Sequence, residues 1–161
     1  MGSLPVRRMD FPYRKLGPRR PPDRAPKLIA SIVDEAADVS AAHHVRPHRI
    51  ALGGRSMGGR MCSMAVAEGL PAAALVLIAY PLHPPGKPDK LRVDHLDQLT
   101  VPCLFVSGTR DPFGTPEELE AATARIPGPV THHRVEGKGH DLRGVDHDVA
   151  LVIRDWLRDL R

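Results

Sequence analysis

The sequence predicts an α/β protein with a mainly parallel sheet of about five strands flanked by helices. Short apolar runs alternate along the chain with stretches of helical periodicity, and glycine-rich turns follow several of the runs. The run Ala73–Ala79 is continuously apolar, as a parallel strand covered by helices on both faces should be. The length of 161 residues fits one domain, so we expect residues 1–161 to fold as a single unit.

The first part of the chain contains a strand candidate, an irregular segment and a helix. The strand candidate is Pro5–Met9, and a Pro/Arg-rich segment follows at about residues 10–25. Apolar residues recur at helical spacing over Pro26–Ala42, and Pro26 suits a first helical turn. We therefore expect a short strand, an irregular arm and a long amphipathic helix.

The middle of the chain reads as strand, helix, strand. We expect a strand at His48–Leu52, a glycine-rich turn, and a helix at Gly58–Glu68 that ends at Gly69. The buried strand Ala73–Ala79 comes next. The prolines of Tyr80–Lys90 exclude regular structure and predict a loop.

The last part continues the alternation. The patterns predict, in order, a short helix at Val93–Leu99, a strand at Pro102–Ser107, a helix at Pro116–Ile126 and a strand at Thr131–Glu136. A final helix presents one apolar face, made of Val149, Val152, Ile153, Trp156, Leu157 and Leu160.

Composition and charge exclude several classes of protein. Apolar residues make up 42% and charged residues 26%, which is typical of a folded chain. The net charge of +4 comes from residues 1–27, which also hold six of the 17 prolines. Such a leader has little of the aromatic interleaving of a single-strand binder, which argues against nucleic-acid binding.

Membrane insertion and metal binding are also not expected. No apolar stretch approaches the roughly 18 residues that span a bilayer, and no secretory signal is visible, so we expect a cytoplasmic protein. Cys62 and Cys103 lack metal-ligand spacing and fit reduced core thiols. We expect no metal and no cofactor.

The most informative motif is Gly53-Gly54-Arg55-Ser56-Met57-Gly58-Gly59, which joins a predicted strand to a predicted helix. The spacing Gly-x-Ser-x-Gly is typical of a nucleophile elbow, a tight turn that raises a serine hydroxyl above the sheet. We expect the flanking glycines Gly54 and Gly58 to be required because side chains there would collide with neighbouring backbone. Ser56 is therefore the candidate nucleophile, and an ordinary glycine-loop serine is the alternative.

Two more titratable residues follow predicted strands. Asp111 comes after Pro102–Ser107, and His140 lies in a Gly-x-Gly-His turn after the last strand. The expected roles are general base for His140 and orienting acid for Asp111, in the order Ser, Asp, His. Two alternatives stay open: Asp111 as a turn or capping residue, and Asp141 as the orienting acid.

Further residues are candidates for contact with a substrate. The backbone N–H of Met57 is expected in the oxyanion hole. Arg55 and Arg60 flank the nucleophile and could favour an anionic substrate, or be solvated residues at the helix start. Tyr80 and His83 are expected near the mouth of the pocket, with rigid packing as the alternative.

Several segments together resemble the α/β-hydrolase family that joins dienelactone-hydrolase-like and testis-expressed-hydrolase-like proteins. They are Asp10-Phe11-Pro12-Tyr13-Arg14, Gly54-Arg55-Ser56-Met57-Gly58, Tyr80-Pro81-Leu82-His83-Pro84 with Lys90-Leu91-Arg92, Leu104-Phe105-Val106-Ser107-Gly108 before Asp111, and His140. The resemblance implies a serine hydrolase site. Dienelactone hydrolases proper have cysteine as nucleophile, so lactone specificity does not transfer.

The resemblance also implies that this chain is an N-terminally short, truncated version of the α/β-hydrolase fold. A complete member would have three more strands and a His-Gly loop that supplies the second oxyanion donor, so we expect weak activity. One missing strand would lie between Pro5–Met9 and His48–Leu52. The exposed edge would then pair directly, accept another chain or form a homo-oligomer.

Two functions follow from these observations. The first is hydrolysis of small esters or other acyl substrates by Ser56, His140 and Asp111. The alternative is a catalytically impaired hydrolase-like scaffold or protein-binding module. A weaker option assigns the Pro/Arg-rich leader to anionic partners.

Overall fold

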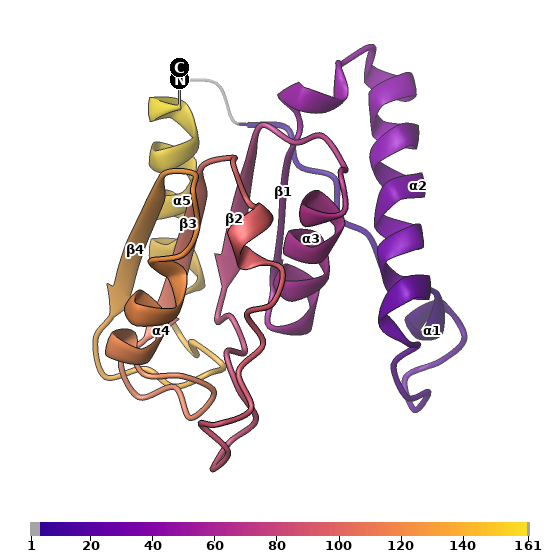
Figure 1. Cartoon of the computed structure of the whole chain (residues 1–161). Coiled ribbons are helices and arrows are strands. Elements are labelled where there is room, and N and C mark those ends of the chain that lie inside the picture. Colours follow the sequence, from indigo (N-terminus) through magenta and orange to yellow (C-terminus); the bar gives the residue numbers. More distant parts are fainter. Residues whose placement is uncertain (1–3, 161) are drawn as a thin grey trace.

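The computed structural model describes residues 4–160, and a sheet of four parallel strands lies at its centre (Figure 1). The strands are β1 (Ala51–Arg55), β2 (Ala74–Ile78), β3 (Cys103–Gly108) and β4 (Val130–Val135), and they are adjacent in chain order. Every pairing is parallel, with Leu52 opposite Leu75 and Phe105 opposite His132. The expected α/β fold with a parallel sheet is confirmed.

Helices cover both faces of the sheet. The larger core lies on the face of α2 (Ala25–His43), α3 (Met57–Ala67) and α4 (Pro116–Thr123), where Leu28, Met61 and Leu119 pack with Phe105 of β3. The smaller core lies under α5 (Asp146–Asp159), where Val149 packs against Val76, Leu104 and Val106. Figure 1 shows α5 alone behind the sheet. The continuous apolar sequences of β2 and β3 therefore serve two cores.

The prediction of a strand at Pro5–Met9 is wrong. Residues 4–11 are in no helix or strand, and Arg7 forms an ion pair with Glu35 of α2 at 2.7 Å instead. Met9 packs against the larger core. This segment is therefore held by α2 and the core rather than by a strand partner, and the sheet has four strands among the described residues.

The bounds of several other elements differ from the predicted ones by a few residues. A 3₁₀ turn at Pro47–Arg49 occupies the start of the expected strand His48–Leu52, so β1 begins later and continues to the glycine-rich turn. The short helix expected at Val93–Leu99 is reduced to the 3₁₀ turn Leu96–Gln98. The helix expected to reach Ile126 ends at Thr123, since a turn follows in which Ile126 N–H donates to the Thr123 carbonyl at 3.0 Å.

The arm between the first residues and α2 is mostly irregular, as expected for about residues 10–25. It contains one four-residue helix, α1 (Pro12–Lys15). Across residues 4–160, no helix combines the length and the apolar character that crossing a bilayer requires.

Candidate active site

Ser56 occupies the sharp turn between β1 and α3. Its backbone has φ 51° and ψ −122°, an unfavourable conformation for a residue with a side chain, and α3 begins at the next residue. Ser56 N–H donates to the Ile78 carbonyl of β2 at 2.8 Å, and its carbonyl accepts from Arg60 N–H at 3.1 Å. Strain of this kind costs on the order of 1–3 kcal/mol and persists only where the surrounding structure imposes it.

Two glycines make the turn possible, and one of them is not the residue that the motif predicted. A Cβ on Gly54 would lie 2.6 Å from the carbonyl carbon of Gly58, and a Cβ on Gly59 would lie 2.6 Å from the Gly54 carbonyl oxygen. A Cβ on Gly58 would meet nothing within 4 Å. The expectation that Gly58 avoids a collision is therefore wrong, because the strand and helix backbones touch at Gly54 and Gly59.

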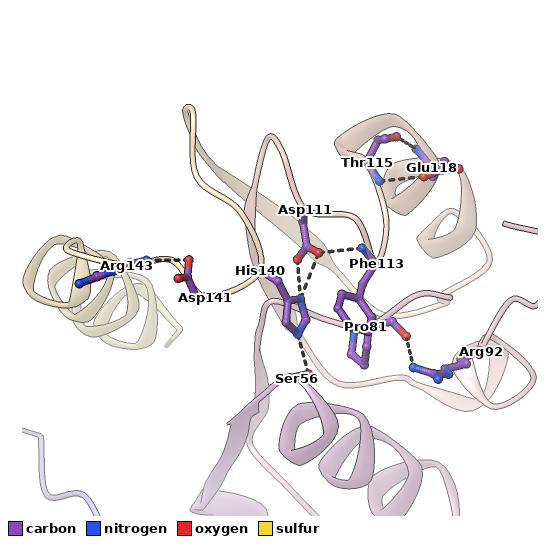
Figure 2. Close-up of polar contacts among 10 residues, drawn as sticks. All are labelled: Ser56, Pro81, Arg92, Asp111, Phe113, Thr115, Glu118, His140, Asp141 and Arg143. Atoms are coloured by element: carbon purple, nitrogen blue, oxygen red, sulfur yellow. Dashed lines mark hydrogen bonds and ion pairs between the residues drawn. The ribbon is translucent and has the colours of Figure 1, made fainter. Parts of the chain in front are cut away.

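The structure brings Ser56, His140 and Asp111 together at the carboxyl edge of the sheet (Figure 2). Ser56 Oγ lies 2.7 Å from His140 Nε2. His140 Nδ1 lies 2.8 Å from Asp111 Oδ2 and 3.1 Å from Oδ1. The Asp111 side chain is 2% exposed and that of His140 is 23% exposed, so the carboxylate is buried and the imidazole remains accessible.

The turn after β3 holds the carboxylate in place. Phe113 N–H donates to Asp111 Oδ1 at 2.8 Å, and the Phe113 ring stacks on the His140 ring with 4.1 Å between centroids. With Asp111 accepting at Nδ1, the imidazole presents Nε2 as an acceptor toward the serine. This arrangement can remove a proton from Ser56 Oγ.

Asp141 does not take the place of Asp111. Its Oδ1 accepts from Arg143 N–H at 3.3 Å, and Figure 2 shows its carboxylate directed away from the imidazole. The structure therefore favours Asp111 over the rival acid on geometric grounds.

Met57 is the first residue of α3. The first N–H groups of a helix have no acceptor within the helix and carry the positive end of its dipole. The Met57 N–H is thus free of helical pairing at the residue that follows the nucleophile. Its role in an oxyanion hole stays a prediction.

The two arginines next to the elbow are far from equivalent. Arg55 is exposed and lines a groove of about 170 Å³ with Leu142, Val149 and Ile153, on the face covered by α5. Arg60 lies on α3, on the opposite face of the sheet, and is half-buried. A substrate near Ser56 would therefore meet the two guanidinium groups from different sides.

Tyr80 and His83 are both buried in the segment after β2. The Tyr80 hydroxyl donates to the Arg92 carbonyl at 2.8 Å, and its ring meets Phe105 edge to face. His83 bonds the Pro84 carbonyl at 2.9 Å and approaches Glu118 Oε2 at 3.3 Å, and these contacts raise its pKa. Through these contacts both rings hold the loop after β2 in place. Direct contact of either ring with a substrate stays a prediction.

Sequence reasoning gave no role at the site to Phe113, Arg92 or His95, and it named Arg92 only within the family-like segment Lys90-Leu91-Arg92. The only feature of the sequence that points to Phe113 is its position two residues after Asp111. His95 Nε2 lies 2.7 Å from Ser63 Oγ of α3, and burial, followed by the charge of Arg60, lowers its pKa to about 4. No spacing in the sequence links His95 or Arg92 to the elbow, because the loop that carries them folds back only in three dimensions.

The cysteines lie in the core. Both are unpaired and buried, and desolvation raises each pKa to about 12. Within residues 4–160, no group of three His, Cys, Asp or Glu side chains is arranged to hold a metal ion.

Comparison with solved structures gives the same fold. The chain matches DcsB in complex with its substrate analogue with a TM-score of 0.69 and 18% identity, over 84% of this chain and 72% of that one. It matches an alpha-beta serine hydrolase homologue from Coxiella burnetii with a TM-score of 0.66 and 20% identity, over 92% and 66%. An arylesterase matches with a TM-score of 0.61 and 18% identity, over 85% and 59%.

The chain is thus shorter than these proteins, spanning between 59% and 72% of their lengths. Comparison of the sequence with family models identifies the family, which the shared fold alone does not. The model of the alpha/beta hydrolase domain family matches residues 2–149, nearly the whole chain. The protein therefore belongs to the alpha/beta hydrolase domain family.

Proposed function

We propose that the protein is a serine hydrolase that cleaves small esters or related acyl compounds, with Ser56 as nucleophile, His140 as general base and Asp111 as orienting acid. The observation that carries this proposal is the continuous line of contacts from Ser56 Oγ to His140 and on to Asp111, at 2.7 and 2.8 Å. The likeness to an arylesterase and to a serine hydrolase homologue supports the reaction class. The finer resemblance to dienelactone-hydrolase-like proteins belongs to the same proposal.

The reaction proceeds by acyl transfer to water. Ser56 Oγ attacks the carbonyl carbon, and its proton passes to His140 Nε2 as the tetrahedral intermediate forms. Collapse breaks the ester bond, and the leaving alcohol takes the proton from Nε2. A water molecule then attacks the acyl-serine, gives a proton to His140, and releases the carboxylic acid as Ser56 recovers its own proton.

Asp111 and the Met57 N–H would stabilise the two charges that develop during the reaction, on the imidazolium and on the oxyanion. The buried carboxylate stabilises the imidazolium and holds Nδ1 in place. We assign the Met57 N–H, at the N-terminus of α3, to the oxyanion hole, where a donor typically contributes on the order of 3 kcal/mol.

Covalent labelling tests the proposal directly. A fluorophosphonate should label Ser56 stoichiometrically, and p-nitrophenyl acetate should be hydrolysed above the uncatalysed rate. Ser56→Ala should abolish both, while Ser40→Ala, at a serine of α2 remote from the site, should abolish neither. Turnover that survives Ser56→Ala would disprove the proposed function.

A second candidate function is the binding of another polypeptide along the free edge of β1. Within residues 4–160 this strand pairs only with β2, and Ala51, Gly53 and Arg55 are exposed. Such an edge offers unpaired backbone groups to another strand, either a partner's or that of a second copy.

Light scattering at increasing protein concentration distinguishes these cases. A homo-oligomer should dissociate in Ala51→Lys, whose exposed charge disfavours edge pairing. A monomer that resists fluorophosphonate would favour the binding module over the hydrolase.

A further inference from the structure

Two arginines lie on the α3 side of the nucleophile. Arg60 is one helical turn beyond Ser56 and its N–H donates to the Ser56 carbonyl at 3.1 Å. Residues four apart on a helix share a face, so the Arg60 side chain begins on the face of the elbow. Arg92 comes from the loop that follows β2.

That loop is fastened so that Arg92 has a defined position. Arg92 N–H donates to the Leu82 carbonyl at 2.8 Å, and its own carbonyl accepts from the Tyr80 hydroxyl at 2.8 Å. Its Nη1 donates to the Pro81 carbonyl at 3.3 Å, and Figure 2 shows the guanidinium reaching toward Pro81. The guanidinium is thus held by backbone rather than left to solvent.

The described residues offer neither guanidinium an anionic partner. Throughout residues 4–160, no carboxylate forms an ion pair with Arg60 or Arg92. Arg60 Nε is shielded from solvent and has no hydrogen-bond partner among the described residues. A buried charged donor without an acceptor is unfavourable, and an acceptor from a ligand would relieve it.

The surroundings concentrate positive charge. Burial, and then the charge of Arg60, lowers the pKa of Arg92, and the same two causes lower the pKa of His95 to about 4. His95 is therefore neutral near pH 7, although the nearby carboxylates of Asp94 and Asp97 act to raise its pKa. Two close cations with a neutral imidazole beside them favour an anion.

We propose that Arg60 and Arg92 bind a carboxylate on the acyl part of the substrate, so that the protein prefers half-esters of dicarboxylic acids to neutral esters of the same length. Planar guanidinium groups pair with carboxylates through two parallel hydrogen bonds, which would orient the acyl chain toward Ser56. This inference rests on the proposed function, and it adds the substrate class.

Matched ester pairs provide the test. The p-nitrophenyl half-esters of succinate, glutarate and adipate are compared with p-nitrophenyl butanoate, pentanoate and hexanoate, after subtraction of each uncatalysed rate. We expect kcat/KM for the best half-ester to exceed that of its neutral counterpart at least about tenfold, as for a charge-assisted hydrogen bond.

The variants assign the preference to the two arginines. Arg60→Met and Arg92→Met should each remove about tenfold of that preference, because kcat/KM should fall more for the half-ester than for the neutral ester. Arg92→Lys should retain part of it, which also guards against a folding defect. Arg49→Met, an exposed arginine before β1 at the other end of the sheet, should change nothing.

The inference would be overturned if the wild type, Arg60→Met and Arg92→Met all showed the same preference for half-esters over neutral esters. That result would leave the proposed function intact. Failure to hydrolyse any ester would instead count against the proposed function, and calorimetric titration with glutarate then decides the inference. Glutarate binding weakened at least about tenfold by Arg60→Met or Arg92→Met supports it. Absent glutarate binding, or binding of inorganic phosphate alone, overturns it.

Discussion

His140 and Asp111 lie on two loops that are bonded to each other, whereas Ser56 follows a strand, β1, that has one neighbour among the described residues. Arg110 N–H donates to the Lys138 carbonyl at 2.9 Å, and Gly137 N–H donates to Thr109 Oγ1 at 2.9 Å. All six residues of β3 are buried, while exposed and half-buried residues alternate in β1. We refer to the loops that carry Asp111 and His140 as the acid–base half, and to the Ser56 elbow as the nucleophile half.

The difference shows that the two halves obtain their precision in different ways. The acid–base half is cross-linked by hydrogen bonds between its loops, and β3 touches the His140 loop at Gly108, where a Cβ would collide with the Lys138 carbonyl. The nucleophile half depends on a strained backbone at Ser56 and on contact between Gly54 and Gly59. We therefore expect side-chain substitutions at Asp111 and His140 to act mainly on chemistry, and substitutions at the close glycine contacts of the elbow to act on stability as well.

The largest expected effect tests whether Ser56 and His140 act together in catalysis. Ser56→Ala and His140→Ala should each lower kcat/KM by about 10⁴-fold, because loss of either group removes nucleophilic attack. The double variant should be no slower than the slower single variant, measured with p-nitrophenyl acetate. Losses that multiply in the double variant would show that the two residues act independently, contrary to the 2.7 Å contact.

A smaller loss is expected within the acid–base half. Asp111→Asn should lower kcat by about 10³-fold, because an amide cannot stabilise the imidazolium and can hold Nδ1 in the wrong tautomer. Asp141→Asn is the matched control and should stay within about twofold, since its side chain contacts Arg143 rather than His140. Equal losses in the two variants would reverse the assignment of the orienting acid.

Sequence reasoning singled out the three residues that meet at the candidate site because each follows a strand, and the carboxyl ends of parallel strands lie at one edge of the sheet. It also found the alternation of strands and helices from apolar periodicity. The signal is local in each case: a run, a turn and a titratable residue within a few positions.

What it could not predict depends on contacts between distant segments. Pro5–Met9 is predicted as a strand, yet it forms no ladder with the free edge of β1, and Arg7 pairs with Glu35 on α2 instead. The Gly-x-Ser-x-Gly spacing points to Gly58, yet the helix touches the strand at Gly59. Arg92 approaches the α3 side of the site only because Tyr80 and Leu82 bind its backbone.

A third prediction compares glycines in the nucleophile half. Gly54→Ala should lower the free energy of unfolding by about 3 kcal/mol, because its Cβ would lie 2.6 Å from backbone that cannot move aside. Gly58→Ala should be neutral or stabilising by up to about 1 kcal/mol, since it lies in α3 with open space around it. Urea unfolding measures both, and a Gly58→Ala variant as unstable as Gly54→Ala would contradict the described contact.

The smallest expected effect concerns pH and the histidine bonded to α3. His95 has a pKa of about 4 in the folded protein, mainly because of burial and then because of Arg60, against about 6.5 in the unfolded chain. Between these values the unfolded chain binds more protons, so the contribution of neutral His95 to stability is complete above pH 6.5 and is lost as the pH falls toward 4. His83, whose pKa is raised, should act in the opposite direction.

His95→Gln isolates this contribution, because the amide can still bond Ser63 and does not titrate. The difference in unfolding free energy between wild type and His95→Gln should shift by about 1 kcal/mol between pH 7 and pH 4.5, a value reduced for the partial exposure of the ring. Urea midpoints at the two pH values measure it. A difference independent of pH would mean that the His95 ring is well solvated rather than buried beside Arg60.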